Sequence, residues 1–265
     1  MKKTCVLLAI LGLGSLAPLS AAAPQPKLQC ESTKWVIDGL SSYCEMREVT
    51  AAFAGSIDVD SSPTGSVSIR GWDDASVLIR ILVLSAAPDE GQANFLAHQV
   101  SVMESAGVIR STGPSRTMDR QWSVSYEIFV PRGTDLTLNA EVGATSVQDV
   151  TGTVRCGANV GAIQLISVNG DVQCHTAVGA ISIALAGDHW EGAGLRVRTN
   201  VGAIEFTIPP NYSAHLDLST ALGSINSTSL LPVLKNGLAR SVATDLGAGG
   251  ATISASTAVG AIVVK

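Results

Sequence analysis

The sequence predicts an all-β protein: a β-solenoid, or single-stranded β-helix-like stack, with rungs of about 18 to 23 residues. Three observations predict this fold. The chain is poor in charged residues (15%) and aromatic residues (4%) but holds 26 glycines, a composition that suits many short strands joined by tight turns. A short glycine-centred motif recurs along the chain at nearly regular spacing. Apolar and polar positions alternate before each copy, as they do in strands with one buried face.

The first 23 residues have the pattern of a secretory signal peptide. Lys2 and Lys3 precede an apolar run that ends near Leu19, and three alanines stand before Pro24. The run is shorter than the roughly 20 residues that a membrane-spanning helix needs. Cys30 does not follow the small-residue box of a lipoprotein. We therefore expect an exported protein of the periplasm or cell surface, with a mature chain that begins near Pro24 and has no lipid or transmembrane segment.

Residues 24–48 are predicted to form an N-terminal segment tied down by a disulfide. Cys5 leaves with the signal peptide, so the mature chain holds Cys30, Cys44, Cys156 and Cys174. An even number of cysteines in an oxidising compartment permits disulfides. Cys30 and Cys44 bracket a short polar segment, and we expect a bridge between them; two unpaired thiols are the alternative.

Residues 49–135 are predicted to be a β-rich capping region with one short helix. Strands are expected at 77–84, 99–109 and 122–130, and a helix over 89–98 that Pro88 and Asp89 begin. Weaker copies of the repeat lie at 55–59 and 65–73. Because the open end of a strand stack must be covered, we expect this region to cap it.

Residues 136–265 carry the regular repeats of the solenoid. The motif is Val-Gly-Ala-Ile or a close variant, and six copies centre on Gly143, Gly161, Gly179, Gly202, Gly223 and Gly260. The positions seven, five, three and one before each glycine are apolar, small or β-branched, and the intervening ones are mostly polar. After the glycine the alternation shifts phase, which predicts a corner that glycine permits. Each copy is then strand, corner, strand and loop, stacked on its neighbour.

The alignment of the copies makes a prediction about Cys156 and Cys174. Each lies five residues before its glycine, so the two occupy equivalent positions on successive rungs. Their Cα atoms should lie about 4.8 Å apart, inside the 4.4 to 6.8 Å that a disulfide needs. We expect a buried structural pair, either oxidised or free, since a free cysteine also packs well in a core.

Nearly the whole mature chain resembles a bacterial β-strand-repeat family of unknown function whose members are often labelled "putative adhesins". The resemblance rests on the repeated corner and on three stretches: CEMRE at 44–48, GSVSIRGWD at 65–73 and WSVSYEIFVPRGT at 122–134. The family's usual corner is Asn-Gly-Asp-Ile or Asn-Gly-Ser-Ile, so the corners of this chain are less polar. The resemblance implies an adhesin-like domain without defining its chemistry, because a fold does not determine a function.

No catalytic residue, cofactor or metal site is predicted. Asp149 and Asp171 stand at different distances from their glycines, so they do not form the carboxylate pair of a glycosidase. The four histidines share no metal-ligand spacing. His189, Trp190 and Glu191 are weak candidates for ligand contact; the favoured alternative is a loop tryptophan that covers the edge of a rung.

The remaining inference concerns the class of function. A net charge of −5 gives no reason to expect nucleic acid as a partner. We expect a non-catalytic exported protein of the cell envelope with an adhesin-like, scaffold or binding role, and an envelope protein or a polysaccharide as its partner. The alternatives are a carbohydrate-active β-helix enzyme and an envelope-stress regulatory protein that acts by protein contact.

Overall fold

The computed structural model describes residues 28–30, 37, 39–61, 63–228 and 231–265. Strands dominate this part of the chain, which has one helix, α1 (Glu90–Gln99). The all-β prediction is therefore confirmed. None of the described residues form a helix that is long and apolar enough to span a membrane. The predicted signal peptide, residues 1–23, lies outside the described residues.

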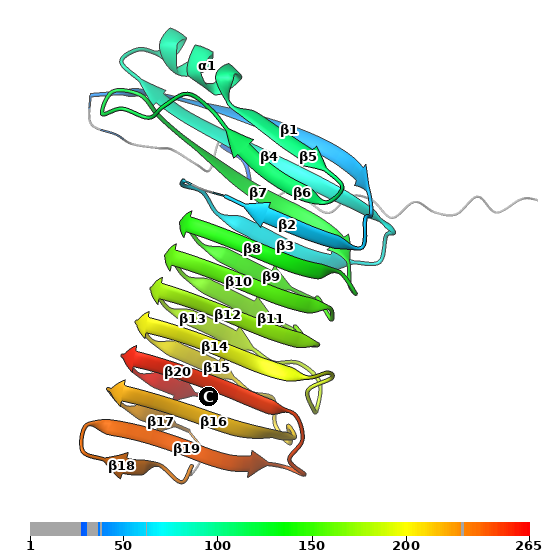
Figure 1. The fold of residues 1–265 in the computed structure, drawn as a ribbon, viewed down its shortest axis with the longest axis vertical. Coiled ribbons are helices and arrows are strands. Elements are labelled where there is room, and N and C mark those ends of the chain that lie inside the picture. The colour runs from blue at the N-terminus through cyan, green and yellow to red at the C-terminus, as the bar shows by residue number, and fades with distance from the viewer. Residues whose placement is uncertain (1–27, 31–36, 38, 62, 229–230) are drawn as a thin grey trace, which may run out of the picture.

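The strands form two large mixed sheets (Figure 1). The ten-stranded sheet has the order β1 (Ser41–Ala52), β4 (Ser76–Ala87), β7 (Gln121–Pro131), β3 (Val67–Trp72), β9 (Thr145–Gln148), β11 (Ile163–Ile166), β13 (Ile181–Ala184), β15 (Ile204–Thr207), β21 (Ile262–Val264), β17 (Ile225–Ser227). The eleven-stranded sheet has the order β18 (Leu234–Asn236), β19 (Ala239–Leu246), β16 (Ala214–Leu222), β20 (Thr252–Val259), β14 (Gly194–Val201), β12 (Asp171–Val178), β10 (Thr153–Val160), β8 (Asp135–Val142), β2 (Ser56–Asp60), β6 (Val108–Thr112), β5 (Ser101–Ser105).

Each copy of the repeat contributes one strand to each sheet. The copy around Gly161 supplies β10 and β11, and the next copy supplies β12 and β13, which pair with them in parallel and in register. Val154 is thus opposite Val172 in one sheet and Ile163 is opposite Ile181 in the other. All four side chains are buried in one apolar core. The alternation seen in the sequence places this core between the sheets.

Glycine is required at the corner by a close approach between neighbouring copies. The six corner glycines have φ between 151° and 159°. A Cβ atom built on Gly179 would lie 1.9 Å from the carbonyl oxygen of Gly161. The Thr176 hydroxyl donates a hydrogen bond to that same oxygen at 3.1 Å. The corner is therefore a tightly packed, hydrogen-bonded contact that leaves no room for a side chain on the glycine.

The position just before each corner is not buried, which corrects the sequence reading. These side chains are 43% to 49% exposed: Val142, Val160, Val178, Val201, Leu222 and Val259. The chain turns from one sheet to the other at this point, so the side chain lies on the rim of the stack instead of between the sheets. The buried columns end two residues earlier, for example at Ala158 and Thr176.

The last copy of the repeat does not stack at the end, although the sequence order predicts that it would. β20 lies between β14 and β16, parallel to both, so Ile253 is opposite Leu195 on one side and Leu216 on the other. The hairpin of β18 and β19 pairs antiparallel with the far edge of β16. Because this hairpin occupies that edge, the chain returns inward, and Figure 1 marks the C-terminus inside the stack.

The N-terminal end is closed by antiparallel strands and the helix. β4 pairs antiparallel with both β1 and β7, and Leu96 and Ala97 of α1 pack into the core. The predicted helix is confirmed, with the Asp89 carboxylate accepting a hydrogen bond from its first turn at 2.8 Å. Arg47 of β1 donates to the carbonyl oxygen of Val100 at the other end of the helix, at 2.7 Å.

Two details of this region differ from the sequence reading. Residues 99–109 were expected to form one strand but contain a turn between β5 and β6. Ala106 and Gly107 both have positive φ, 51° and 82°, as a two-residue hairpin turn requires. Of the two weak repeat copies, only Gly65 stands at a corner, stacked on Gly143; residues 56–60 form β2, the strand that leads to that corner.

Both predicted cysteine pairs form disulfides. Cys30 is bonded to Cys44, and Cys156 is bonded to Cys174 across β10 and β12, with Cα atoms 4.5 Å apart. The stacked position predicted for the second pair is therefore confirmed. The bond joins neighbouring strands of the core, whereas the first bond ties residues near the N-terminus to β1.

Removal of the stacked disulfide is expected to destabilise the protein moderately. Replacing Cys156 and Cys174 together by alanine should lower the free energy of unfolding by at most about 3 kcal/mol, because the bond closes an 18-residue loop in the unfolded chain. Denaturant unfolding measures the difference. The matched control replaces Cys30 and Cys44 by alanine, which leaves the strand stack cross-linked. An unchanged unfolding midpoint in the first variant would show that the bond does not constrain the unfolded chain.

Candidate functional site

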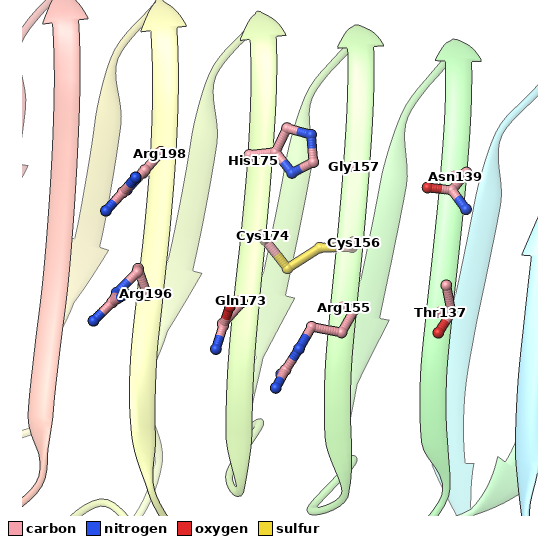
Figure 2. A pocket seen from close by; sticks show the side chains of 10 residues that line it. All are labelled: Thr137, Asn139, Arg155, Cys156, Gly157, Gln173, Cys174, His175, Arg196 and Arg198. Carbon is pink, nitrogen blue, oxygen red and sulfur yellow. A yellow bond between two sulfur atoms is a disulfide. The ribbon is translucent and has the colours of Figure 1, made fainter.

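The outer face of the eleven-stranded sheet carries a shallow groove of about 360 Å³ (Figure 2). We call it the arginine groove. Its lining residues are Thr137, Asn139, Arg155, Cys156, Gly157, Gln173, Cys174, His175, Arg196 and Arg198. They come from four neighbouring strands, β8, β10, β12 and β14, so the groove runs across the copies of the repeat.

The register of the strands assembles the groove from residues far apart in the sequence. Arg155 is opposite Gln173, which is opposite Arg196, and these form one outward row. The next outward row includes Gly157, His175 and Arg198. Neighbouring members of a row are about 4.8 Å apart, the spacing of paired strands.

Gly157 accounts for the hollow at the centre of the groove. Every other lining strand carries a side chain at this position, namely Asn139, His175 or Arg198. A Cβ atom on Gly157 would lie 2.8 Å from the Cε1 atom of His175, so the imidazole already leans over the glycine. A larger residue here would displace the imidazole and fill the hollow.

The groove is positively charged although the chain as a whole has a net charge of −5. Three of its ten lining residues are arginines, and none of the ten is an aspartate or a glutamate. Arg155 donates to the carboxylate of Asp171 at 2.5 Å and to its carbonyl oxygen at 2.8 Å. This hydrogen bond lowers the pKa of the Asp171 carboxyl, and the charge of Arg196 adds to the effect. The Arg198 side chain forms no hydrogen bond or ion pair with the described residues.

The Cys156–Cys174 disulfide lies directly beneath the groove. Figure 2 shows the bond joining β10 to β12, the strands that carry Arg155 and His175. Both cysteines are buried, so their side chains face the core while their neighbours face outward. The bond fixes the spacing of the two strands at the point where the hollow lies.

Two further hollows continue the groove along the sheet. One of about 300 Å³ shares Asn139, Gly157 and His175 with it and is also lined by Glu141 of β8. Another of about 250 Å³ shares Arg196 and Arg198 and extends over β20, where small serines face outward, to Asp217 of β16. Together the three hollows make a trough that crosses the strands from β8 to β16 and contains the arginine side chains.

The structure does not place the sequence candidates His189, Trp190 and Glu191 at this groove. The indole of Trp190 is buried and donates to the carbonyl oxygen of Gly170 at 3.0 Å, the favoured alternative of a tryptophan covering the edge of a copy. The His189 Nδ1 atom lies 2.6 Å from the Asp188 carboxylate, which lowers the pKa of that carboxyl. The backbone N–H of Glu191 donates to Asn169. These contacts tie the loop to the stack.

The groove residues were missed because they are adjacent only in the sheet. Aligning the copies on their glycines puts Arg155, Gln173 and Arg196 in one column, which reads as an ordinary solvated position. The next outward-facing column, four residues before each glycine, contains Gly157 and Arg198, the other groove residues that the alignment could have revealed. Among the residues in the described ranges, no cluster of three or more histidines, cysteines or acids is placed to hold a metal ion.

Comparisons with known proteins find similarity in structure alone. No family model and no curated protein matches the chain. One similar solved structure is a "putative cell adhesion protein" from Clostridium sporogenes, with 11% identity and a TM-score of 0.44 over 85% of this chain and 99% of that one. A "putative adhesin" from Bacteroides fragilis has 10% identity and a TM-score of 0.40 over 83% and 97%.

A third structure is a "putative lipid binding protein" from Parabacteroides distasonis, with 9% identity and a TM-score of 0.29 over 84% of this chain and 97% of that one. The names of two of these three structures refer to adhesion.

Proposed function

We propose that the chain is an exported, non-catalytic binding protein of the cell envelope and that the arginine groove is its ligand site. In this proposal residues 1–23 are a signal peptide and 24–48 a disulfide-tied segment. Residues 49–135 form a cap, and 136–265 form a two-sheeted β-solenoid. The mature chain resides in the periplasm or at the cell surface. The two disulfides fit this location, since such bonds persist in oxidising compartments.

The solenoid part of the proposal is supported by the way the copies pair. Each copy adds one strand to each sheet, parallel to and in register with its neighbours. The core is continuous from one copy to the next. Such units derive their stability from stacking and present long, regular outer faces for binding.

The observation that carries the binding proposal is the unpaired guanidinium of Arg198 beside a hollow. The side chain of Arg198 has no hydrogen-bond or ion-pair partner in the described part of the chain, and Arg196 lies two residues before it on β14. Arginines in a concave surface are well suited to hold an anionic or polar ligand. No carboxylate lines the groove, whereas a glycosidase would need two carboxyl groups flanking the bond that it cleaves.

A screen of envelope polysaccharides tests the proposal, with binding and product release measured side by side. The mature chain should bind at least one polymer without releasing shorter sugars. Replacing Gly157 by leucine should abolish that binding, because the new side chain fills the hollow. Gly133→Leu is the matched control, since nothing lies within 4 Å of a Cβ atom at Gly133. Release of shorter sugars would support the carbohydrate-active enzyme instead, and binding that survives Gly157→Leu would place the ligand elsewhere.

A further inference from the structure

We propose that the ligand of the arginine groove is a linear polysaccharide that carries carboxylate groups on successive sugars and lies across the strands. This inference rests on the proposed function and adds the chemical class of the ligand. It follows from the charge, the spacing and the shape of the site.

The charge of the site favours an anionic ligand. Arg155, Arg196 and Arg198 bring three guanidinium groups to one groove, and only Arg155 is hydrogen-bonded to a carboxylate. A guanidinium offers a planar fork of donors that matches a carboxylate. Arg155 already donates from one nitrogen to the Asp171 carboxylate, at 2.5 Å, and from the other to the Asp171 carbonyl oxygen. A ligand carboxylate can occupy the same kind of position beside Arg196 and Arg198.

The spacing of the arginines favours a ligand with more than one negative group. Arg196 and Arg198 are two residues apart on one strand, about 7 Å along it. Arg155 lies two strands away, about 10 Å from Arg196 across the sheet. A ligand with one carboxylate can neutralise one of these sites. A chain with a carboxylate on each of several sugars can reach two or three of them.

The shape of the site favours an extended chain over a compact ligand. The trough of three connected hollows is open and crosses the strands from β8 to β16, and carboxylates line it only at its two ends, at Glu141 of β8 and Asp217 of β16. Thr137, Asn139 and Gln173 line it with hydroxyl and amide groups, which are suitable partners for sugar hydroxyls. No phenylalanine, tyrosine or tryptophan lines the groove. A single-stranded nucleic acid would lack the aromatic faces on which its bases stack.

The test compares two forms of one polymer. Unesterified polygalacturonate carries a carboxylate on each sugar, and its fully methyl-esterified form has the same backbone without the charge. Calorimetry with the full mature chain should detect binding of the first polymer only, and the affinity should fall as salt is added. The variant with Arg196→Gln and Arg198→Gln should bind on the order of tenfold more weakly or worse, because two charge-assisted contacts are lost.

The matched control has the substitutions Lys235→Gln and Arg240→Gln. It removes the same charge from the terminal hairpin of β18 and β19, away from the groove. Its affinity should equal that of the unchanged protein. If it loses as much affinity as the groove variant, the attraction comes from the overall charge and the inference is wrong.

The remaining outcomes separate this inference from the proposed function. If the esterified polymer binds as tightly as the unesterified one, and Gly157→Leu abolishes this binding, the anionic ligand is rejected but the binding groove is retained. Equally tight binding of polyphosphate or single-stranded DNA would show a general polyanion site and reject the carboxylate. If neither form of polygalacturonate binds but another polymer in the screen binds in a way that Gly157→Leu abolishes, the ligand class is rejected and the binding groove is retained. If Gly157→Leu affects none of the bound polymers, both proposals fail.

Discussion

Replacing Gly179 by valine is expected to lower the free energy of unfolding by about 3 kcal/mol or more. The new Cβ atom would lie 1.9 Å from the carbonyl oxygen of Gly161, which belongs to the backbone and cannot move aside independently. The hydrogen bond from Thr176 to that oxygen would be disturbed as well. A β-branched residue is also poorly suited to the positive φ of 158°. Chemical denaturation measures the loss.

Gly133→Val is the control for this substitution. Gly133 is not among the glycines of positive φ, and a Cβ atom there has no neighbour within 4 Å. A change within about 0.5 kcal/mol is expected, as for other exposed sites. If Gly179→Val and Gly133→Val are equally stable, the corner accommodates a side chain, and the steric contact does not explain why glycine stands there.

Ending the chain after Leu246 is expected to destabilise the C-terminal part of the stack by about 5 kcal/mol. The missing residues include Ile253, Ile262 and Val264, which are buried, and each such side chain contributes roughly 1.5 to 3 kcal/mol. They also supply the strands between β14 and β16 and between β15 and β17. Hydrogen exchange should accelerate in β16 and stay slow in β8 to β12.

A synthetic peptide of residues 247–265 provides the complementary experiment. Added to the shortened protein, it should restore slow exchange in β16, whereas a peptide of scrambled sequence should not. If β16 in the shortened protein remains as protected as in the full chain, then β14 and β16 can pair directly. The place of the last copy would then be unimportant for stability.

The features that were predicted correctly depend on local periodicity. The alternation before each glycine and its change of phase after it specify two strands and a corner. Alignment on the glycines then correctly paired Cys156 with Cys174. The helix followed from its first turn, where Asp89 accepts the hydrogen bond that a helix start requires. Each of these patterns is contained within one or two copies of about 20 residues.

The order of the copies could not be obtained in the same way. All copies have the same alternation, so β20 is as suitable a neighbour for β14 as β16 would be. What decides the order is the hairpin of β18 and β19 on the far edge of β16, a contact between segments with no repeat signature. The exposed valines of the rim were missed for a related reason, because alternation does not indicate where a strand leaves the sheet.

The candidate site could not be predicted from the sequence because its residues differ from copy to copy. Arginine, glutamine, histidine and glycine share no motif, and they become a site only through the register of four strands. The sequence candidates at 189–191 were chosen because they are consecutive. Consecutive residues in a loop contact different surroundings, and here Trp190 turns inward while His189 remains exposed.

The interior place of the last strand pair has a consequence for the timing of folding. Synthesis proceeds from the N-terminus, so β16 and β19 exist before β20 does, and until then β16 has no parallel partner. Every earlier copy can dock as soon as it has been made. The copy around Gly223 reaches its native position only after residues 252–264 have been inserted between it and the copy around Gly202. A chain that stops before β20 lacks the strand that fills the gap between β14 and β16, so the closed stack forms only when residues 252–264 are present.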